Sequence, residues 1–365
     1  MGFRCGIVGL PNVGKSTLFN ALTETQAAQA ANYPFCTIEP NVGQVAVPDP
    51  RLDKLAAIAG SARIIPTQLA FVDIAGLVRG ASKGEGLGNK FLGAIREVDA
   101  VLHVLRCFED PDVTHVEGGV DPLRDAELVE TELLLADLES LERQKDGLIK
   151  RARGQDKEAR ARLELLDRIQ PPLEQGRPAR SLGLSADDLE LVKGFNLITA
   201  KPVLYVCNVD EASAAHGNAL TAQAAAMAAA QGARHVVISA AIEAELSALS
   251  DEEKREYLAS LGLEEPGLNR VIREGHELLG LLTFFTVGPK EARAWTAHQG
   301  ATAPQAAGVI HTDFERGFIA AEVIAYHDFV RLGGEQGAKE QGRMRLEGRD
   351  YVVQDGDVCH FRFNV

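Results

Sequence analysis

The sequence predicts an α/β protein whose main domain is built on an open, mostly parallel sheet. Short apolar runs of the kind that form buried parallel strands recur along the chain, and the stretches between them have helical character. The candidate strands are residues 3–8, 42–47, 68–72, 99–105, 202–207 and 236–238. In such a fold, ligands bind at the carboxyl ends of the strands.

A helical insertion interrupts this alternation after Pro122. From Arg124 to Arg168 the chain is rich in Leu, Glu, Ala, Arg and Lys, and its leucines recur at helical spacing. This pattern predicts a long helical hairpin with its turn at Gly154, ended by the Pro171–Pro172 pair. Because another strand candidate follows the hairpin, we expect it to be inserted into the main domain.

The sequence pattern changes again from Leu282, where short strand-like runs and turns replace the helical pattern. The runs 282–287, 350–353 and 358–363 predict a separate, small β-rich domain. The expected organisation is a main domain of residues 1–122 and 191–280, a helical insertion of residues 123–190, and a C-terminal domain of residues 281–365.

The composition indicates an intracellular globular protein. The chain has 365 residues, of which 45% are hydrophobic, and a formal net charge of -14. Its five cysteines are scattered and form no CxxC pair, which favours a reducing cytoplasm over a disulfide framework or a zinc site. No apolar run approaches the length that spans a bilayer, so we expect no membrane association. The acidic balance argues against general adhesion to nucleic acid.

A phosphate-binding motif follows the first strand. The segment Gly9-Leu-Pro-Asn-Val-Gly-Lys-Ser matches GxxxxGK[ST] and leads into a helical stretch, the context in which this motif is most specific. Its backbone N–H groups surround the β-phosphate, and Lys15 contacts the β- and γ-phosphates. This predicts a P-loop nucleotide hydrolase fold of the Ras-like type.

Metal ligands are expected around this loop. The Ser16 hydroxyl ligates Mg²⁺, and Thr37, on the loop after the first helix, supplies a second hydroxyl when the γ-phosphate is present. Asp73, which opens the Asp73-Ile-Ala-Gly76 motif after a strand, holds Mg²⁺ through water. The Gly76 N–H then contacts the γ-phosphate.

The water-activating group is not evident. Leu77 occupies the position where Ras-type enzymes have a glutamine that orients the attacking water, and a leucine cannot do this. His103, in the strand 99–105, is the nearest candidate, and a packed strand histidine is an equally good interpretation. Asn12, within the P-loop, is a candidate for seating a monovalent cation such as K⁺.

The base-reading loop departs from the guanine pattern Asn-Lys-x-Asp. Here Asn208-Val209-Asp210-Glu211 puts valine in place of lysine and the longer glutamate in place of aspartate. Guanine loses its paired acceptor, whereas Asn208 can still bond the adenine edge and Val209 can approach the ring. Ser239 and Ala240 complete the pocket through backbone contacts. We therefore expect ATP to bind in preference to GTP, with relaxed specificity as the alternative.

These motifs together resemble the YchF subfamily of Obg-like ATPases. The resemblance rests on Gly9 to Asn20, the Pro34-Phe-Cys-Thr37 loop, Asp73 to Leu77, Asn208 to Glu211 and the C-terminal segment. It covers nearly the whole chain, with Val209 as a mild departure. It implies a G domain with an inserted coiled coil and a C-terminal TGS domain of ubiquitin-like β-grasp fold. It also implies Mg²⁺-dependent ATP hydrolysis, binding to the ribosome and its large subunit, and phosphate binding by Asn12, Val13, Gly14, Lys15, Ser16 and Thr17.

Two local clusters of basic residues are candidate RNA contacts. Residues 145–162 at the hairpin tip hold seven basic and three acidic residues, and Lys339, Arg343, Arg345 and Arg349 cluster in the C-terminal domain. At the tip, a solvated helix face held by intrahelical ion pairs is an equally good interpretation.

Three functions remain open from the sequence. The first is an ATPase switch that reports to the ribosome. The second is a ribosome-binding module in which the nucleotide is mainly a conformational ligand, an alternative that Leu77 keeps open. The third is a conventional GTPase.

Overall fold

The computed structural model describes residues 3–30, 41–74, 87–154 and 156–364, and it confirms the predicted α/β sheet. The first sheet has the strand order β2-β4-β1-β5-β6-β7. Its strands are β1 (Arg4–Val8), β2 (Val42–Ala46), β4 (Gln68–Asp73), β5 (Ala100–Arg106), β6 (Val203–Asn208) and β7 (Arg234–Ile238). The pairs β1–β4, β1–β5, β5–β6 and β6–β7 are all parallel. Every residue of β5 and β6 is buried, as continuous apolar runs predict.

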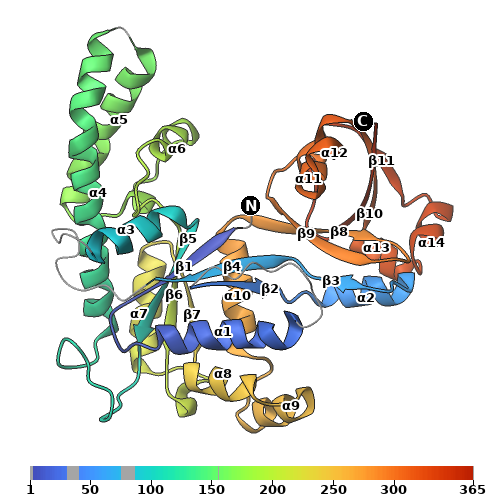
Figure 1. The fold of residues 1–365 in the computed structure, drawn as a ribbon, viewed down its shortest axis with the longest axis horizontal. Coiled ribbons are helices and arrows are strands. Elements are labelled where there is room, and N and C mark those ends of the chain that lie inside the picture. Colours follow the sequence, from blue (N-terminus) through green and yellow to red (C-terminus); the bar gives the residue numbers. More distant parts are fainter. Residues whose placement is uncertain (1–2, 31–40, 75–86, 155, 365) are drawn as a thin grey trace. The chain divides into compact units, whose positions relative to one another are not determined.

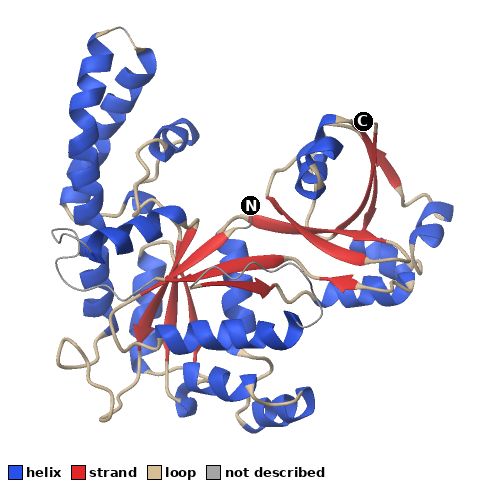
Figure 2. Cartoon of the chain, in the orientation of Figure 1, coloured by secondary structure: helices blue, strands red, loops and turns tan. Residues whose placement is uncertain are grey.

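Helices cover both faces of this sheet (Figures 1 and 2). Apart from the insertion, the longer helices of this unit are α1 (Lys15–Ala30), α3 (Leu87–Glu97), α7 (Ala219–Ala230), α8 (Ala240–Ser247), α9 (Asp251–Ser260) and α10 (Gly267–Leu278). Within the described ranges, each helix is too short or too polar to cross a bilayer.

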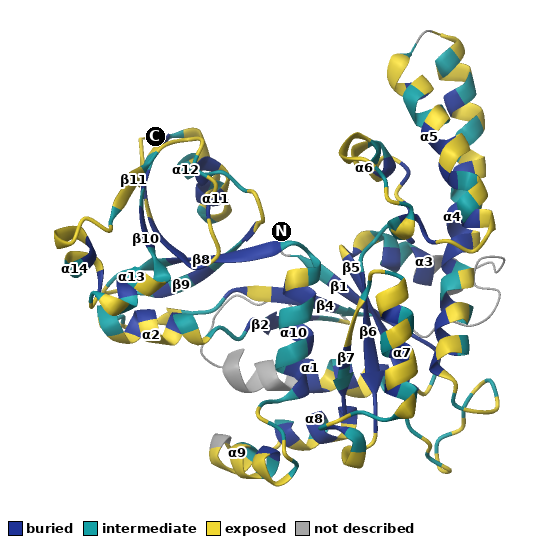
Figure 3. Cartoon of the chain, turned by 180° about the vertical axis from the view of Figure 1, so that it is seen from behind, coloured by how far each residue is buried: buried dark blue, intermediate teal, exposed yellow. Residues whose placement is uncertain are grey.

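The predicted hairpin consists of α4 (Pro122–Arg153) and α5 (Lys157–Glu174), and it projects from the sheet (Figure 1). Asp121 caps α4 by accepting hydrogen bonds from the N–H groups of Leu123 and Arg124. The two helices bury a leucine-rich core together with the short helices η1 (Ala179–Ser181) and α6 (Ala186–Lys193). Burial falls towards the tip, where most residues are exposed (Figure 3).

One expectation about the hairpin was wrong. Pro171 and Pro172 do not end α5, because both lie within its last turn. Their carbonyl oxygens accept from the N–H of Gln175, so the helix closes one turn later. A helical φ suits proline, and the two prolines remove only their own hydrogen bonds to the carbonyl groups four residues earlier.

The chain divides into two compact units: the first comprises residues 1–45 and 70–275, and the second comprises residues 46–69 and 276–365. The sheet of the second unit has the order β11-β10-β12-β8-β9-β3. The strands are β3 (Ile64–Ile65), β8 (Leu281–Val287), β9 (Ala292–His298), β10 (Phe318–Ala325), β11 (Arg345–Glu347) and β12 (Asp357–Phe363). The helices of the second unit are α2 (Pro50–Ala59), α11 (Ala303–Ile310), α12 (Thr312–Arg316), α13 (Tyr326–Arg331) and α14 (Glu335–Glu340). The first unit also contains the short helix η2 (Glu211–Ser213).

This division differs from the predicted boundaries at residues 46–69. That stretch, assigned from sequence to the main domain, falls in the second unit because Leu52 and Leu55 of α2 pack against Phe285 and Ala294. The run 350–353 also differs, since it makes only an isolated bridge between Val352 and Thr302 and no strand.

Candidate functional site

The P-loop joins β1 to α1 with backbone angles that only some residues adopt. Gly9 and Gly14 have φ of 152° and 97°, and Asn12 has 62°. A Cβ on Gly9 would lie 2.5 Å from the carbonyl oxygen of Val104, and one on Gly14 would lie 2.3 Å from Nδ2 of Asn208. Both glycines are therefore required by close packing as well as by conformation.

The side chain of Lys15 contacts the backbone of the P-loop. Its side chain is buried, and Nζ donates to the carbonyl oxygen of Leu10 at 2.7 Å. Burial lowers the pKa of Lys15 to about 8, and nearby Asp73 opposes this shift. The ammonium thus replaces water with a protein oxygen, a bond that it can exchange for phosphate oxygens.

The residues predicted to bind Mg²⁺ fit a hard cation. Ser16 and Thr17 lie exposed in the first turn of α1, and Asp73 ends β4. Burial raises the pKa of Asp73, and Lys15 pulls it back down. Hydroxyl and carboxylate oxygens are the ligands that Mg²⁺ prefers. Thr37 and Gly76 lie outside the described residues.

The base-reading loop is fixed to the P-loop by Asn208. Its Nδ2 donates to the carbonyl oxygen of Val13 at 3.0 Å, and its Oδ1 accepts from the N–H of Ala240 at 2.9 Å. The amide therefore positions three loops relative to one another. Its contact with the adenine edge stays a prediction, because both ends of the side chain already have partners within the protein.

The other base-pocket residues differ in exposure. Val209 is buried and Glu211 is exposed. Ser239 lies buried before α8, and its Oγ has no hydrogen-bond partner among the described residues. An unpaired buried hydroxyl is costly, which favours a ligand contact at Ser239.

His103 lies within the sheet, away from solvent. Its ring centroid is 5.5 Å from that of Tyr205, and Nε2 has no partner among the described residues. Burial lowers the pKa of His103 to about 3, aided by the charges of Arg180 and Lys15. An imidazole with so low a pKa is a weak general base. This favours the interpretation of His103 as a histidine packed within the strand.

The loop after β5 was not singled out from the sequence. Arg106 is fully buried and donates to the carbonyl oxygens of Phe108, Asp110 and Val113 at 2.9–3.2 Å. The loop reaches the P-loop, because Nδ2 of Asn12 donates to the carbonyl oxygen of Thr114 at 3.1 Å. The sequence signal that could have pointed to this loop is a charged residue, Arg106, at the end of an otherwise mostly apolar strand.

The same loop is anchored to α4 by a histidine. Nε2 of His115 lies 2.8 Å from Oδ2 of buried Asp125, and Nδ1 accepts from the N–H of Glu117. Both ring nitrogens are engaged, so His115 ties the loop beside the P-loop to the base of the hairpin.

At the hairpin tip, some side-chain cations have no partner among the residues that the structure describes. Three of its seven basic residues form ion pairs: Lys145 with Asp167, Arg151 with Asp156, and Arg162 with Glu158. The other four are exposed, and no hydrogen bond or ion pair joins their side-chain cations to the described residues: Lys150, Arg153, Lys157 and Arg160. Of these three pairs, Arg162 with Glu158 lies within one helix, whereas the other two join α4 to α5 or to its N-cap, so intrahelical pairing accounts for a small part of the tip.

Comparisons with known proteins agree with this architecture. A family model described as a 50S ribosome-binding GTPase matches residues 4–145. A model of the YchF GTPase C-terminal domain, described as a protein of unknown function, matches residues 281–364. The first match includes residues 46–69 of the second unit, and the second match lies wholly within that unit.

Curated relatives match over the full length. The chain is 60% identical to the ribosome-binding ATPase YchF of Haemophilus influenzae and 56% identical to that of Escherichia coli O157:H7, covering 100% of both chains in each case. It is 52% identical to the Bacillus subtilis protein of the same name, again with full coverage. The solved structure of the Schizosaccharomyces pombe YchF GTPase has a TM-score of 0.89 and 38% identity, with 99% of this chain and 98% of that chain covered. The chain belongs to the YchF family of ribosome-binding ATPases.

Proposed function

We propose that this chain is a Mg²⁺-dependent ATPase that binds ATP in preference to GTP and acts on the ribosome. The observation that carries the proposal is the pair of hydrogen bonds at Asn208, which donates to the carbonyl oxygen of Val13 and accepts from the N–H of Ala240. They hold the altered base loop and the phosphate loop in one site, so the base at one end and the phosphates at the other are read together.

The ATP preference rests on the chemistry beside Asn208. Buried Val209 offers the base an apolar contact, and exposed Glu211 stands where a guanine-specific loop has its shorter aspartate. A site that leaves a buried polar group of the ligand unpaired rejects that ligand strongly. The relatives from Haemophilus influenzae and Escherichia coli are named ATPases, which supports the same preference.

The bound metal supplies charge neutralisation at the phosphates, with Ser16, Thr37 and Asp73 as its proposed protein contacts. Lys15 exchanges its bond to Leu10 for phosphate oxygens, and the N–H groups of the P-loop orient the β-phosphate. Asn12 uses Nδ2 for the carbonyl of Thr114, which leaves its Oδ1 for a monovalent cation such as K⁺.

The ribosome is the proposed partner, which places the activity in the cytoplasm. The unpaired cations of the tip suit the phosphates of ribosomal RNA on the large subunit. In the C-terminal domain, Arg349 is engaged within the protein, because it donates to the carbonyl oxygen of Phe318 and lies over its ring. The proposed RNA contact there thus rests on fewer residues than the tip contact.

A nucleotide titration tests this proposal. Calorimetry with Mg²⁺ should give an ATP affinity at least tenfold above that for GTP, about 1.4 kcal/mol. Steady-state hydrolysis of ATP, with and without ribosomes, then separates an ATPase from a module that only uses nucleotide as a ligand. Tighter binding of GTP would overturn the base assignment.

A matched pair of variants isolates the phosphate loop. Lys15→Ala should abolish turnover, whereas Lys54→Ala, an exposed position on α2, should leave it unchanged. Hydrolysis by Lys15→Ala at the normal rate would remove the enzyme assignment. Ribosome binding without turnover in the unaltered chain would favour the binding-module alternative.

A further inference from the structure

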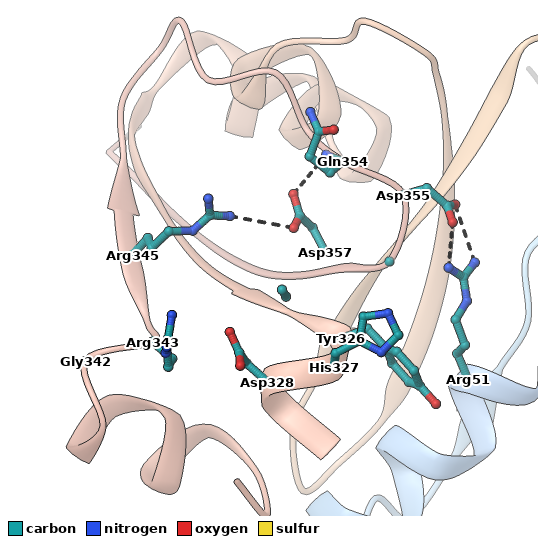
Figure 4. Close-up of a pocket in the computed structure, with 12 residues that line it drawn as sticks. Arg51, Tyr326, His327, Asp328, Gly342, Arg343, Arg345, Gln354, Asp355 and Asp357 are labelled. Atoms are coloured by element: carbon teal, nitrogen blue, oxygen red, sulfur yellow. Dashed lines mark hydrogen bonds and ion pairs between the residues drawn. The ribbon is translucent and has the colours of Figure 1, made fainter. Parts of the chain in front are cut away.

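The second unit contains a cavity of about 540 Å³ that no assigned activity uses (Figure 4). It lies between α13, the segment that leads into β11, and residues 354–357 at the start of β12. Its volume falls within the range of small-molecule sites. The lining comprises Arg51, Ala325, Tyr326, His327, Asp328, Gly342, Arg343, Arg345, Gln354, Asp355, Gly356 and Asp357.

The acidic lining groups already have partners within the protein. Asp355 accepts from Nη1 of Arg51 at 2.6 Å and from the N–H of Thr283 at 2.9 Å. These contacts hold the pKa of Asp355 below its usual range, although burial opposes them. Its charge is therefore compensated before any ligand arrives.

The other two carboxylates are compensated in the same way. Asp357 accepts from the Tyr351 hydroxyl at 2.7 Å and from the N–H of Gln354 at 2.9 Å. Asp328 pairs with Arg331 at 2.5 Å. A cationic ligand would have to displace an internal donor from each of them.

The basic lining groups are less fully compensated. Arg51 is held between Asp49 and Asp355. Nη2 of Arg345 donates to the Tyr351 hydroxyl at 2.9 Å, but the closest carboxylate oxygens to Arg345 are 3.6 and 3.8 Å away, on Glu347 and Asp357. Arg343 is exposed, and no hydrogen bond or ion pair joins its guanidinium group to the described residues. The groups left to bind a ligand are thus mainly guanidinium N–H donors.

The opposite side of the cavity is aromatic. The rings of Tyr326 and His327 form an edge-to-face pair with centroids 5.3 Å apart. Figure 4 shows Arg343 and Arg345 on one side and these two rings on the other. The cavity therefore separates an anion-binding wall from a wall that suits the flat, organic part of a ligand.

We propose that this cavity binds a phosphate-bearing small molecule of mononucleotide size, with its phosphate at Arg343 and Arg345 and its ring against Tyr326 and His327. Planar guanidinium groups bind phosphate oxygens in a bidentate manner. The site is separate from the P-loop and goes beyond the proposed ATPase activity. A backbone phosphate of single-stranded RNA has the same charge, and the test separates it from the small ligand.

The test is a calorimetric titration of the full chain whose P-loop is first saturated with a fluorescent ADP and Mg²⁺. Adenosine 5′-monophosphate is the first probe, inorganic phosphate the second, and a short single-stranded RNA with terminal hydroxyls the third. We expect the monophosphate to bind without displacing the fluorescent ADP. Phosphate should bind more weakly, because it cannot contact the rings.

Two variants with the same charge change make the assignment specific. Arg343→Ala should weaken monophosphate binding at least tenfold. Arg316→Ala, at an exposed position on α12 outside the cavity, should leave it unchanged. Exposed substitutions of this kind rarely destabilise a fold, so a lost signal reports the site.

Three results would overturn the proposal. The first is that neither the monophosphate nor phosphate binds the unaltered chain. The second is that Arg343→Ala and Arg316→Ala bind equally well, which would place the ligand elsewhere. The third is that only the RNA binds, which would make the cavity part of an RNA interface. Each result leaves the ATPase test at the P-loop unaffected.

Discussion

The phosphate loop and the hairpin tip both carry cations for anionic ligands, but they hold them differently. At the phosphate loop, Lys15 and Asn208 are buried and hydrogen-bonded to the backbone before a ligand binds. At the tip, Lys150 and Arg153 are exposed, without partners in the described chain. Preorganised groups give geometric specificity, whereas free charges give attraction that is sensitive to salt.

The largest expected effect comes from breaking the preorganised region at Gly14. In Gly14→Ala the new Cβ would lie 2.3 Å from Nδ2 of Asn208, at a φ of 97° that alanine rarely adopts. Strain of about 1–3 kcal/mol and the loss of a buried hydrogen bond worth a similar amount add to about 4 kcal/mol. We expect a loss of nucleotide affinity on the order of a thousandfold, measured by calorimetry.

Gly147→Ala provides the matched control, because a Cβ there meets nothing within 4 Å. It should bind ATP normally and melt at the same temperature or slightly higher. Normal ATP binding by Gly14→Ala would show that the loop tolerates movement of Asn208, and the contrast with the tip would then fail.

A second prediction concerns Glu243, one turn into α8. It is buried, with Oε1 accepting from the N–H of Gly267 at 2.7 Å and Oε2 without a partner in the described chain. Burial raises the pKa of Glu243 to about 7. Because the unfolded chain ionises at lower pH, the folded state should lose stability as the pH rises from about 4.5 to 7, by about 3 kcal/mol in all.

Glu243→Gln should remove this pH dependence while keeping the hydrogen bond to Gly267. Urea unfolding at pH 5 and pH 8 measures it, as the difference in unfolding free energy between the variant and the unaltered chain. For Glu252→Gln, at an exposed position on α9, the unfolding free energy should change between pH 5 and pH 8 by the same amount as in the unaltered chain. If the unfolding free energy of Glu243→Gln also changed with pH as in the unaltered chain, this would contradict the raised pKa of Glu243.

The sequence could place the phosphate loop because that signal is local. The motif from Gly9 to Ser16 adjoins its own strand and helix, so pattern and structure coincide. The inward turn of the Asn208 amide could not be read in this way. Its partners, Val13 and Ala240, are 195 and 32 residues away in the chain, and only the folded sheet brings them together.

Tertiary packing also explains why residues 46–69 pack with the second unit, although the sequence pattern groups them with the main domain. The apolar positions Leu52 and Leu55 recur at helical spacing and predict a buried face, but not which core buries it. The parallel pairing of β3 with β9 joins segments more than 200 residues apart. A linear pattern carries no information about such a partner.

The third prediction sharpens the tip side of the comparison. Arg153→Glu with Lys157→Glu should weaken ribosome binding at least tenfold in a sedimentation assay, because two unpaired cations become anions. The slope of log affinity against log salt should become shallower by about one for each lost phosphate contact. Arg177→Glu with Lys193→Glu makes the same charge change away from the tip and should bind normally. If both double variants lost the same amount of ribosome affinity, the cause would be general charge repulsion, and the tip would not be a docking surface.

The smallest effect is expected at His103, in the middle of β5. Its ring packs against Tyr205, whose hydroxyl donates to Gln231 at 2.8 Å, and the charge of nearby Arg180 helps to keep the imidazole neutral. A pKa lowered to about 3 means that the folded state loses stability as the pH falls from 6.5 towards 3. His103→Phe should remove this acid sensitivity and change ATP turnover by no more than about twofold, since a weak base contributes little. Turnover and acid unfolding, measured on the same preparation, separate the two interpretations. A hundredfold fall in turnover with unchanged stability at pH 7 would make His103 catalytic and extend the preorganised region through β5.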